Sequence, residues 1–192
     1  MKILLIAATS DEIIKECFSN SEILISGVGM VNTTYALTKH LSNNFYDLVI
    51  NMGVAGCFSS AIKIGDVVEV VEDAFSEIGF ENGMEFEEFS DFKITNTFKV
   101  EGNTNLQQVK GITVNTVHGN ESSISKIVSR FNPEVESMEG AAVFKVCKEF
   151  NIPCVQIRAI SNKVEKRNKA NWDIPLAIQN LNTTLSRIIT EL

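Results

Sequence analysis

The chain has 192 residues, of which 44% are hydrophobic and 21% charged, so it can bury one sizeable core and is not of the disordered, low-complexity kind. Its formal net charge of -7 argues against a nucleic-acid partner, because such binding depends on Lys and Arg at the phosphates. The four cysteines form no CxxC pair, and no apolar run approaches the roughly 20 residues that span a bilayer. We therefore expect a cytoplasmic protein without disulfides or a membrane segment.

Apolar, β-branched runs without polar alternation predict strands that are buried on both faces. These predicted strands are Lys2–Ala8, Glu22–Ser26, Tyr46–Val54, Asp66–Val71, Gly111–Val117 and Pro153–Ser161. Apolar residues at helical spacing predict helices over Val31–Leu41, Ser122–Arg130, Met138–Phe150 and Pro175–Leu192. The alternation predicts one α/β domain over residues 1–192, with a largely parallel sheet covered by helices on both faces.

The segment from Asp73 to Phe92 differs from the rest, because it is acidic, contains glycine and is unusually rich in phenylalanine. One interpretation is a hairpin or flap that packs on its own body. The other is a flap that crosses a dimer interface and helps to close the pocket of a neighbouring subunit.

Two glycine-containing turns follow predicted strands. The turn Gly27–Asn32 (GVGMVN) opens a helix, which suits an anion or a ribose at the helix N-terminus but equally suits a tight turn without a ligand. It is not a full dinucleotide motif, since Asn32 occupies the third glycine position. Small residues in Asn51–Gly56 (NMGVAG) would let a ligand approach the backbone, although a structural turn explains them nearly as well.

Several polar residues fall at strand ends, where ligands of open α/β sheets bind. Glu12 follows the first strand, Glu139 begins a predicted helix, and Arg158 and Asn162 lie at the end of the last strand. Each also has a structural explanation, such as a first-turn helix acid or a solvated loop residue. We interpret His40 as a surface residue and find no metal-ligand spacing. His118, at a strand end before Gly119, is interpreted as a loop histidine, with a place near a pocket as the alternative.

Six segments in sequence order resemble the purine nucleoside phosphorylase and 5'-methylthioadenosine nucleosidase superfamily: the first strand with its acid, then GVGMVN, DLVINMGVAG, KIGDVVEV, ESMEGAAV and IRAISN. The resemblance implies a three-layer nucleoside phosphorylase-like α/β fold, with a central mixed, partly barrel-like sheet flanked by helices. It also implies a small-molecule purine nucleoside as partner, no cofactor or metal, and a homodimer or higher homo-oligomer.

Site residues follow from the same resemblance. Glu12 is similar to the residue that activates the attacking water, Glu139 to the carboxylate that holds the ribose diol, and Arg158 to an arginine near sugar and water. Asn162 stands where the adenine-specific nucleosidases carry an Asp. The resemblance also implies substrate-binding residues, with Met138 against the ribose and the first three on the pocket floor: Gly53, Val54, Ala55, Ser137, Met138, Arg167 and Trp172.

Two departures from the superfamily pattern concern the chemistry. The phosphate-binding arginines of the phosphorylases have no counterpart, since the first strand ends in Ala8-Thr9-Ser10-Asp11, and water is therefore the expected nucleophile. No aromatic residue follows Gly119, where the methylthioadenosine enzymes place one against the base.

Asn162 favours a 6-oxopurine leaving group. Its amide can donate to the carbonyl of hypoxanthine and accept from the protonated imidazole-ring nitrogen, whereas an ionised Asp would face that carbonyl acceptor to acceptor. The stretch Ile160–Ile178 resembles the futalosine-hydrolysing branch of the superfamily, whose substrate is a hypoxanthine nucleoside with an aromatic carboxylate on its sugar. Lys166 or Arg167 could pair with that carboxylate, and Trp172 could pack on its ring or instead anchor the last helix.

Other functions stay open at this point. The nearest is a nucleosidase for adenine nucleosides, such as methylthioadenosine, S-adenosylhomocysteine or aminodeoxyfutalosine. A purine nucleoside phosphorylase comes next, then a non-catalytic nucleoside-binding protein on the same fold. A dehydrogenase is disfavoured by the incomplete glycine motif.

Overall fold

The computed structural model describes residues 1–18, 21–83 and 85–191. Its main sheet comprises β1 (Ile3–Ala7), β2 (Glu22–Ile25), β3 (Leu48–Cys57), β4 (Val67–Phe75), β7 (Thr97–Lys99), β8 (Gln107–Thr113), β9 (Val135–Ser137) and β10 (Cys154–Lys163). The α-helices are α1 (Met30–Leu41), α2 (Glu121–Phe131), α3 (Gly140–Phe150) and α4 (Ile174–Glu191), and a separate hairpin is formed by β5 (Phe80–Asn82) and β6 (Glu85–Glu87).

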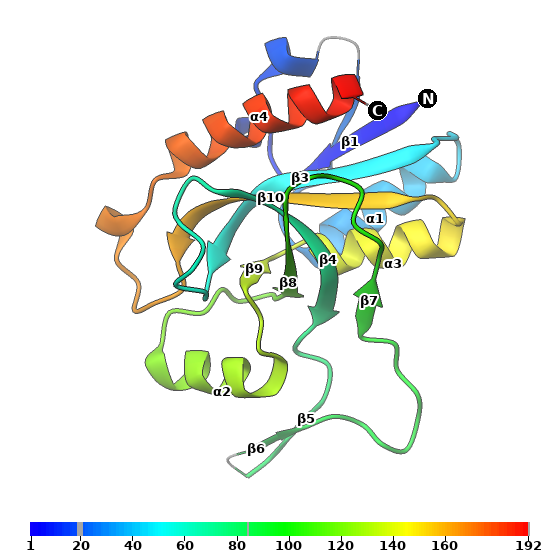
Figure 1. Cartoon of the computed structure of the whole chain (residues 1–192). Coiled ribbons are helices and arrows are strands. Elements are labelled where there is room, and N and C mark those ends of the chain that lie inside the picture. The colour runs from blue at the N-terminus through cyan, green and yellow to red at the C-terminus, as the bar shows by residue number, and fades with distance from the viewer. Residues whose placement is uncertain (19–20, 84, 192) are drawn as a thin grey trace.

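The central sheet is partly closed into a barrel. β10 pairs with both β4 and β3, so the path β10–β4–β8–β9–β3 returns to β10, while β1 and β2 extend the sheet beyond β3 (Figure 1). β3 is parallel to β1 and β10, whereas β4 and β10 are antiparallel. The mixed, partly barrel-like sheet that the resemblance implies is therefore confirmed.

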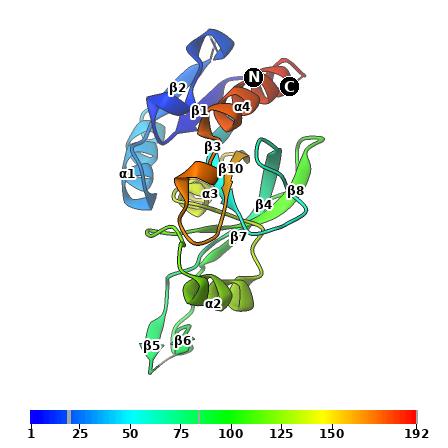
Figure 2. The same ribbon diagram turned by 90° about the vertical axis from the view of Figure 1, so that its left-hand side faces the viewer.

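Helices cover both faces of the sheet because successive strand residues point to opposite sides. Leu4 and Ile6 of β1 pack with α1 and α3, whereas Leu5 packs with Met52 of β3 and Leu181 of α4. Figures 1 and 2 show α1 and α3 together on one side of the strands and α4 on the other. The arrangement is the expected three-layer α/β fold.

The boundaries of several predicted elements were wrong. β3 ends at Cys57 and not at Val54, and β4 ends at Phe75 and not at Val71. β8 runs over Gln107–Thr113, four residues earlier than Gly111–Val117, because its exposed first residues are polar and give no apolar signal. α3 begins at Gly140 and not at Met138, because Glu139, with φ -129° and ψ -27°, departs from helical geometry and acts as the N-cap. β7 and β9 have three residues each, too few for a periodic pattern.

The segment from Asp73 to Phe92 contains the end of β4 and the β5–β6 hairpin, which projects beyond α2 (Figure 2). The Arg130 guanidinium of α2 lies 3.7 Å from the ring centre of Phe86, so the hairpin does contact its own body. Phe89 stacks on Phe92 and contacts Phe80 at a tilted angle, and all three rings are substantially exposed. That the flap reaches a neighbouring subunit stays a prediction.

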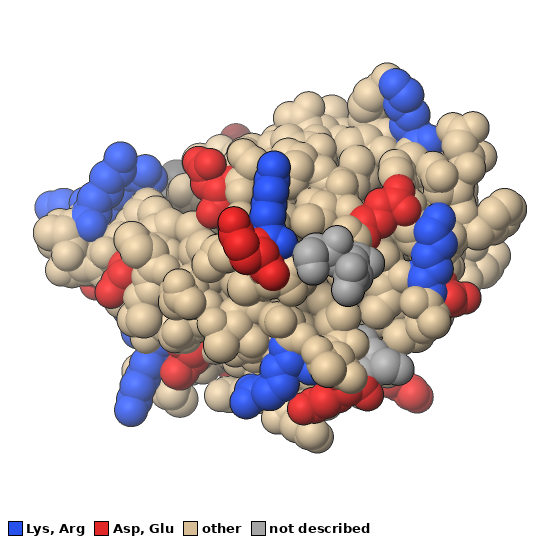
Figure 3. Space-filling view, turned by 90° about the horizontal axis from the view of Figure 1, so that it is seen from above, with Lys and Arg blue, Asp and Glu red and all other residues tan. Residues whose placement is uncertain are grey.

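Charges of both signs are interspersed on the one face of the molecule that Figure 3 shows. On the face seen in Figure 3, Lys and Arg side chains alternate with Asp and Glu and form no basic stripe among the coloured residues. Within the described ranges, no helix combines the length and apolarity needed to cross a membrane.

A buried polar network supports the start of α3. Asp73 of β4 is fully buried and accepts hydrogen bonds from Thr113 Oγ1 and from Gln156 Nε2, each at 2.9 Å. Thr113 Oγ1 in turn accepts from the backbone N–H of Ala141 at 2.7 Å, in the first turn of α3. A Cβ at Gly140 would collide with Asp73 and Gln156, which explains the glycine there. Burial raises the pKa of Asp73 to about 6 from its ordinary 3.8, although its hydrogen bonds oppose the shift.

This raised pKa predicts a stability effect for Asp73→Asn. The folded chain binds a proton more tightly than the unfolded chain, so the contribution is present below pH 3.8 and is lost as pH rises through about 6. The shift corresponds to about 3 kcal/mol. The amide of the variant would stay neutral and could donate to Gln156 Oε1, which is buried without a partner. We expect the mutant to gain about that much stability relative to wild type between pH 4 and pH 7.

Chemical denaturation at a series of pH values measures the effect. In Asp73→Asn, the free energy of unfolding should decrease less steeply with rising pH than in wild type. Some decrease should remain, because the raised pKa of Glu12 acts in the same direction. Asp91→Asn, on an exposed loop, is the matched control. Parallel stability curves for wild type and Asp73→Asn would contradict the prediction.

Candidate active site

A cavity of about 400 Å³ opens where β1, β3, β9 and β10 end. Most of the residues predicted from the sequence line it: Glu12, Val54, Ala55, Ser137, Met138, Glu139, Asn162, Arg167 and Trp172. Gly53 and Arg158 lie behind its wall. The fold therefore brings together residues that are up to 160 positions apart in the chain, from Glu12 to Trp172.

Glu12 is fixed by backbone donors at the end of β1. It ends the 3-10 turn Ser10–Glu12, and its Oε2 accepts from the N–H groups of Ala8 and Thr9, both at 3.1 Å. Its Oε1 accepts from the N–H of Val54 in β3, also at 3.1 Å. Burial raises the pKa of this carboxyl, while Arg158 and the backbone hydrogen bonds oppose the rise. Glu12 is thus both a local capping acid, as the structural explanation held, and a carboxylate positioned in the cavity.

Arg158 reaches Glu12 through the space left by a glycine. The two strands place Arg158 of β10 opposite Gly53 of β3. A Cβ at Gly53 would collide with Nη1 of Arg158 and lie 2.8 Å from Oε1 of Glu12. The guanidinium is 1% exposed, and its Nε and Nη2 find no hydrogen-bond partner among the described groups. Buried donors of this kind are uncommon and often mark functional positions.

Glu139, in the cavity wall, is hydrogen-bonded to the turn that precedes α1. As the N-cap of α3 it is nearly buried, and its Oε1 accepts from the N–H of Gly29 at 2.9 Å. Gly29 is itself the N-cap of α1, and Gly27 and Gly29 have φ angles of +84° and +92°, which side chains disfavour. The N-terminus of α1 therefore receives the carboxylate of Glu139, and Oε2 of this residue is the atom that a ligand can engage.

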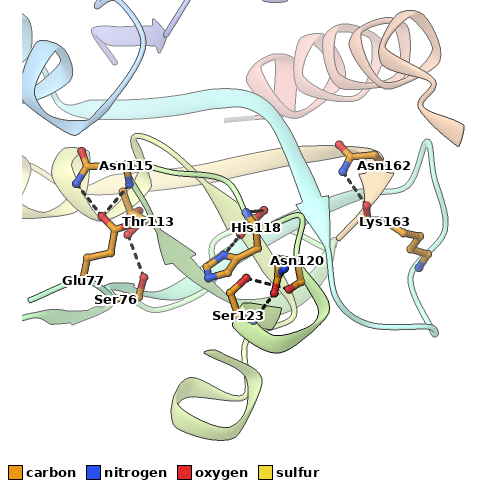
Figure 4. A network of polar contacts seen from close by, with 10 residues as sticks. Ser76, Glu77, Thr113, Asn115, His118, Asn120, Ser123, Asn162 and Lys163 are labelled. Carbon is orange, nitrogen blue, oxygen red and sulfur yellow. Dashed lines mark hydrogen bonds and ion pairs between the residues drawn. The ribbon is translucent and has the colours of Figure 1, made fainter. Parts of the chain in front are cut away.

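Asn162 follows a bulge in β10, between Ile160 and Asn162. Its Oδ1 accepts from Ser161 Oγ at 2.8 Å, and its Nδ2 donates to the carbonyl of Lys163 at 2.9 Å (Figure 4). An amide has two hydrogens on nitrogen and two lone pairs on oxygen. One donor and one acceptor site therefore stay available at the cavity surface.

The rim of the cavity carries an arginine and a tryptophan. The Arg167 guanidinium lies 4.9 Å from the ring centre of Trp172, which follows the 3-10 turn Lys169–Asn171. The Nζ of Lys163 binds the carbonyls of Ser59 and Ile62, so this cation is directed away from the space. Trp172 is partly exposed, unlike a core anchor for α4.

Among the wall residues that were not predicted as site residues, His118 and Glu136 form a polar pair. His118 is a loop residue, as expected, but its ring Nδ1 lies 2.7 Å from Glu136 Oε2. The available signal was Glu136 itself, the acidic residue that opens the ESMEGAAV motif. Among the described residues, no group of three or more His, Cys, Asp or Glu side chains is arranged to hold a metal ion.

Two curated proteins are similar to this chain in sequence. The chain is 25% identical to a futalosine hydrolase of Thermus thermophilus over 181 residues, which is 88% of this chain and 80% of that one. It is 32% identical to a 5'-methylthioadenosine/S-adenosylhomocysteine nucleosidase of Bacillus cytotoxicus over 165 residues, covering 79% of this chain and 71% of that one.

Solved structures show the same fold. A futalosine hydrolase mutant of Helicobacter pylori superposes with a TM-score of 0.86 at 20% identity, over 100% of both chains. A Helicobacter pylori 5'-methylthioadenosine/S-adenosylhomocysteine nucleosidase in complex with butyl-thio-DADMe-Immucillin-A gives a TM-score of 0.87 at 19% identity, over 100% of this chain and 99% of that one. The family model described as the phosphorylase superfamily matches residues 21–192. The chain therefore belongs to the phosphorylase superfamily, which confirms the resemblance found in its motifs.

Proposed function

We propose that this chain hydrolyses the N-glycosidic bond of futalosine, releasing hypoxanthine and dehypoxanthine futalosine, and thereby acts in menaquinone biosynthesis. The observation that carries the proposal is an amide, Asn162, in the same cavity as two carboxylates, Glu12 and Glu139. The similarity to the Thermus thermophilus futalosine hydrolase supports it.

Cleavage of a purine nucleoside develops positive charge on the sugar and negative charge on the leaving base. Glu139 binds the ribose diol and stabilises the sugar cation, and Glu12 takes a proton from the water that attacks the anomeric carbon. Asn162 donates to the six-position carbonyl and accepts from the protonated ring nitrogen. Arg158 lies behind Gly53 and beside the Glu12 carboxylate, on which it acts through its positive charge.

Water is the proposed nucleophile. A phosphorylase needs a cationic cradle for phosphate. The Glu12 carboxylate is held by backbone N–H groups of Ala8, Thr9 and Val54, and the Arg158 cation beside it is buried behind Gly53 and does not line the cavity. The Lys163 cation is engaged by Ser59 and Ile62. These contacts support hydrolysis over phosphorolysis.

Arg167 and Trp172 fit the aromatic carboxylate of futalosine. A guanidinium forms paired, charge-assisted hydrogen bonds with a carboxylate, and an indole ring packs against an aromatic ring. Arg167 lines the cavity, which favours it over Lys166 as the partner. With Trp172 in the same wall, the aliphatic side chains of Ile174 and Ile178 complete an apolar surface for the ring.

A cytoplasmic homodimer or larger homo-oligomer is part of the proposal. The outer face of α1 supports assembly, because Val31 is 76% exposed and Tyr35 68% exposed. Exposed apolar patches of this kind are typical of protein interfaces.

The second candidate is a nucleosidase for adenine nucleosides. It is favoured by the 32% identity to the Bacillus cytotoxicus nucleosidase. In that case the substrate would be methylthioadenosine, S-adenosylhomocysteine or aminodeoxyfutalosine. Asn162 would then have to accept a hydrogen bond from the six-position amine.

Incubation with futalosine, aminodeoxyfutalosine, inosine and methylthioadenosine, with and without phosphate, tests the proposal. We expect free hypoxanthine from futalosine without phosphate, and a higher kcat/KM for futalosine than for inosine, which lacks the carboxylate. Preference for aminodeoxyfutalosine would favour the second candidate. A rate that needs phosphate and yields a sugar 1-phosphate would identify a phosphorylase.

A further inference from the structure

His118 and Glu136 form a buried pair in the wall of the cavity. Glu136 Oε2 lies 2.7 Å from the ring Nδ1 of His118, and Glu136 Oε1 accepts from the backbone N–H of His118 at 3.0 Å. The side chain of Glu136 is 4% exposed and that of His118 is 14% exposed. Phe58 meets the imidazole edge to face at 6.2 Å. Two contacts with one carboxylate and one with an aromatic ring hold the imidazole in a single orientation.

The pair lies across one strand from Asn162. In the sheet, Gly56 of β3 is the register partner of Asn162 in β10 on one side and of Glu136 in β9 on the other. A Cβ at Gly56 would lie 3.3 Å from Asn162 Nδ2 and 3.4 Å from Glu136 Cγ, so both side chains flank the same face of this glycine. The backbones of the two residues are two strand spacings apart, about 10 Å. Figure 4 shows His118 and Asn162 on either side of the end of β3.

The contacts with Glu136 select one tautomer of the histidine. A carboxylate only accepts hydrogen bonds, so Nδ1 carries the hydrogen and the neutral ring presents Nε2 as an acceptor. The six-position and N1 are adjacent on the purine ring. In a 6-oxopurine N1 carries a hydrogen, whereas in a 6-aminopurine N1 is a lone pair. An acceptor beside N1 therefore selects the 6-oxo base.

We propose that His118, held in this tautomer by Glu136, accepts the N1 hydrogen of a 6-oxopurine and is a second determinant of base selection beside Asn162. The inference rests on the proposed function, and it adds a specificity residue that acts at a different atom of the base. His118 is the group that touches the substrate, and Glu136 is a positioning residue.

Glu136→Gln tests the inference because it should reverse the histidine. The backbone N–H of His118 still requires an oxygen, so the amide nitrogen is left facing Nδ1. Nδ1 must then be unprotonated, and Nε2 becomes a donor suited to the N1 lone pair of adenine. We expect the ratio of kcat/KM for futalosine to that for aminodeoxyfutalosine to fall about tenfold or more. Glu121→Gln, an exposed residue at the start of α2, is the matched control.

His118→Phe keeps a ring beside Phe58 and removes both nitrogens. We expect it to lower turnover of the 6-oxo substrate more than turnover of the 6-amino substrate, so that the ratio of the two kcat/KM values falls. Calorimetric affinities for free hypoxanthine and adenine give a second readout that is independent of hydrolysis. In wild type hypoxanthine should bind more tightly, and Glu136→Gln should shift the affinity ratio toward adenine by a similar factor.

The outcomes separate the inference from the function. If wild type prefers futalosine but both variants keep the substrate and base ratios, or lose all activities equally, the pair only braces the loop and the inference is overturned. If no nucleoside is hydrolysed but the base affinities shift as expected, the inference stands and the proposed function fails. Tighter binding of adenine than hypoxanthine by wild type would mean that Nε2 donates, which also overturns the inference.

Discussion

Glu12→Gln should lower kcat for nucleoside hydrolysis by about 10²–10⁴-fold, the contribution expected of a general base. The carboxylate is held by three backbone N–H groups and lies beside Arg158, so it can accept a proton from water without having to reorganise. A glutamine has the same shape but cannot take the proton. Steady-state and single-turnover rates with futalosine would measure the loss.

Folding and binding must be checked in the same variant, since the amide nitrogen would face a backbone donor on one side. Thermal unfolding and hypoxanthine affinity serve this purpose, and both should stay close to wild type if only the proton acceptor is lost. Glu16→Gln, on the exposed turn Lys15–Phe18, makes the same change in charge without touching the cavity. Full turnover by Glu12→Gln would remove Glu12 from the mechanism.

The pH profile of the wild-type enzyme gives an independent check. Glu12 acts as a base only when ionised, so kcat should fall as pH decreases through its pKa. Burial raises that pKa above the ordinary value of 4.5. The acid limb should therefore lie above pH 4.5, and it should be absent from the residual rate of Glu12→Gln.

Local sequence patterns were sufficient for the layers of the fold. The apolar runs around Leu5, Ile50 and Ile157 predicted the central strands, because burial on both faces requires apolar residues within a few consecutive positions. Apolar residues at helical spacing predicted α1 and α4. No local sequence pattern predicts the closure of the sheet into a barrel. This closure depends on β10 pairing with β4 as well as β3, which is a long-range property of sheet twist and register.

The same distinction applies to the cavity. Glu12, Glu139 and Asn162 were found because they sit in motifs at strand ends. His118 and Glu136 were missed as a pair because they are 18 residues apart and come together when β9 pairs with β8, the strand that precedes the His118 loop. The need for glycine at position 53 was equally invisible, since it arises from Arg158, which reaches past that position from β10.

Asn162→Asp should change which base the enzyme releases. In wild type the amide presents a donor to a six-position carbonyl, whereas an ionised Asp presents only acceptors. Leaving the buried carbonyl opposite a carboxylate costs about 1–3 kcal/mol, and an exocyclic amine would gain a hydrogen bond. We expect the ratio of kcat/KM for futalosine to that for aminodeoxyfutalosine to fall about 100-fold.

The local contacts of Asn162 sharpen this expectation. Ser161 donates to Oδ1, and Nδ2 donates to the carbonyl of Lys163, so the second oxygen of an Asp would oppose that carbonyl unless it carried a proton. A protonated Asp can give its proton to the imidazole nitrogen of a departing adenine, which makes the variant a functional adenine nucleosidase and not merely a damaged enzyme.

Asn168→Asp, the N-cap of an exposed turn where either residue accepts from the backbone, is the matched control and should leave the ratio unchanged. An Asn162→Asp variant that loses both substrates equally would show that residue 162 supports the β10 bulge without contacting the base. A variant that keeps the wild-type ratio would leave base selection to His118, because that side chain meets the six-membered ring from across Gly56 and its hydrogen bonds to Glu136 do not involve residue 162.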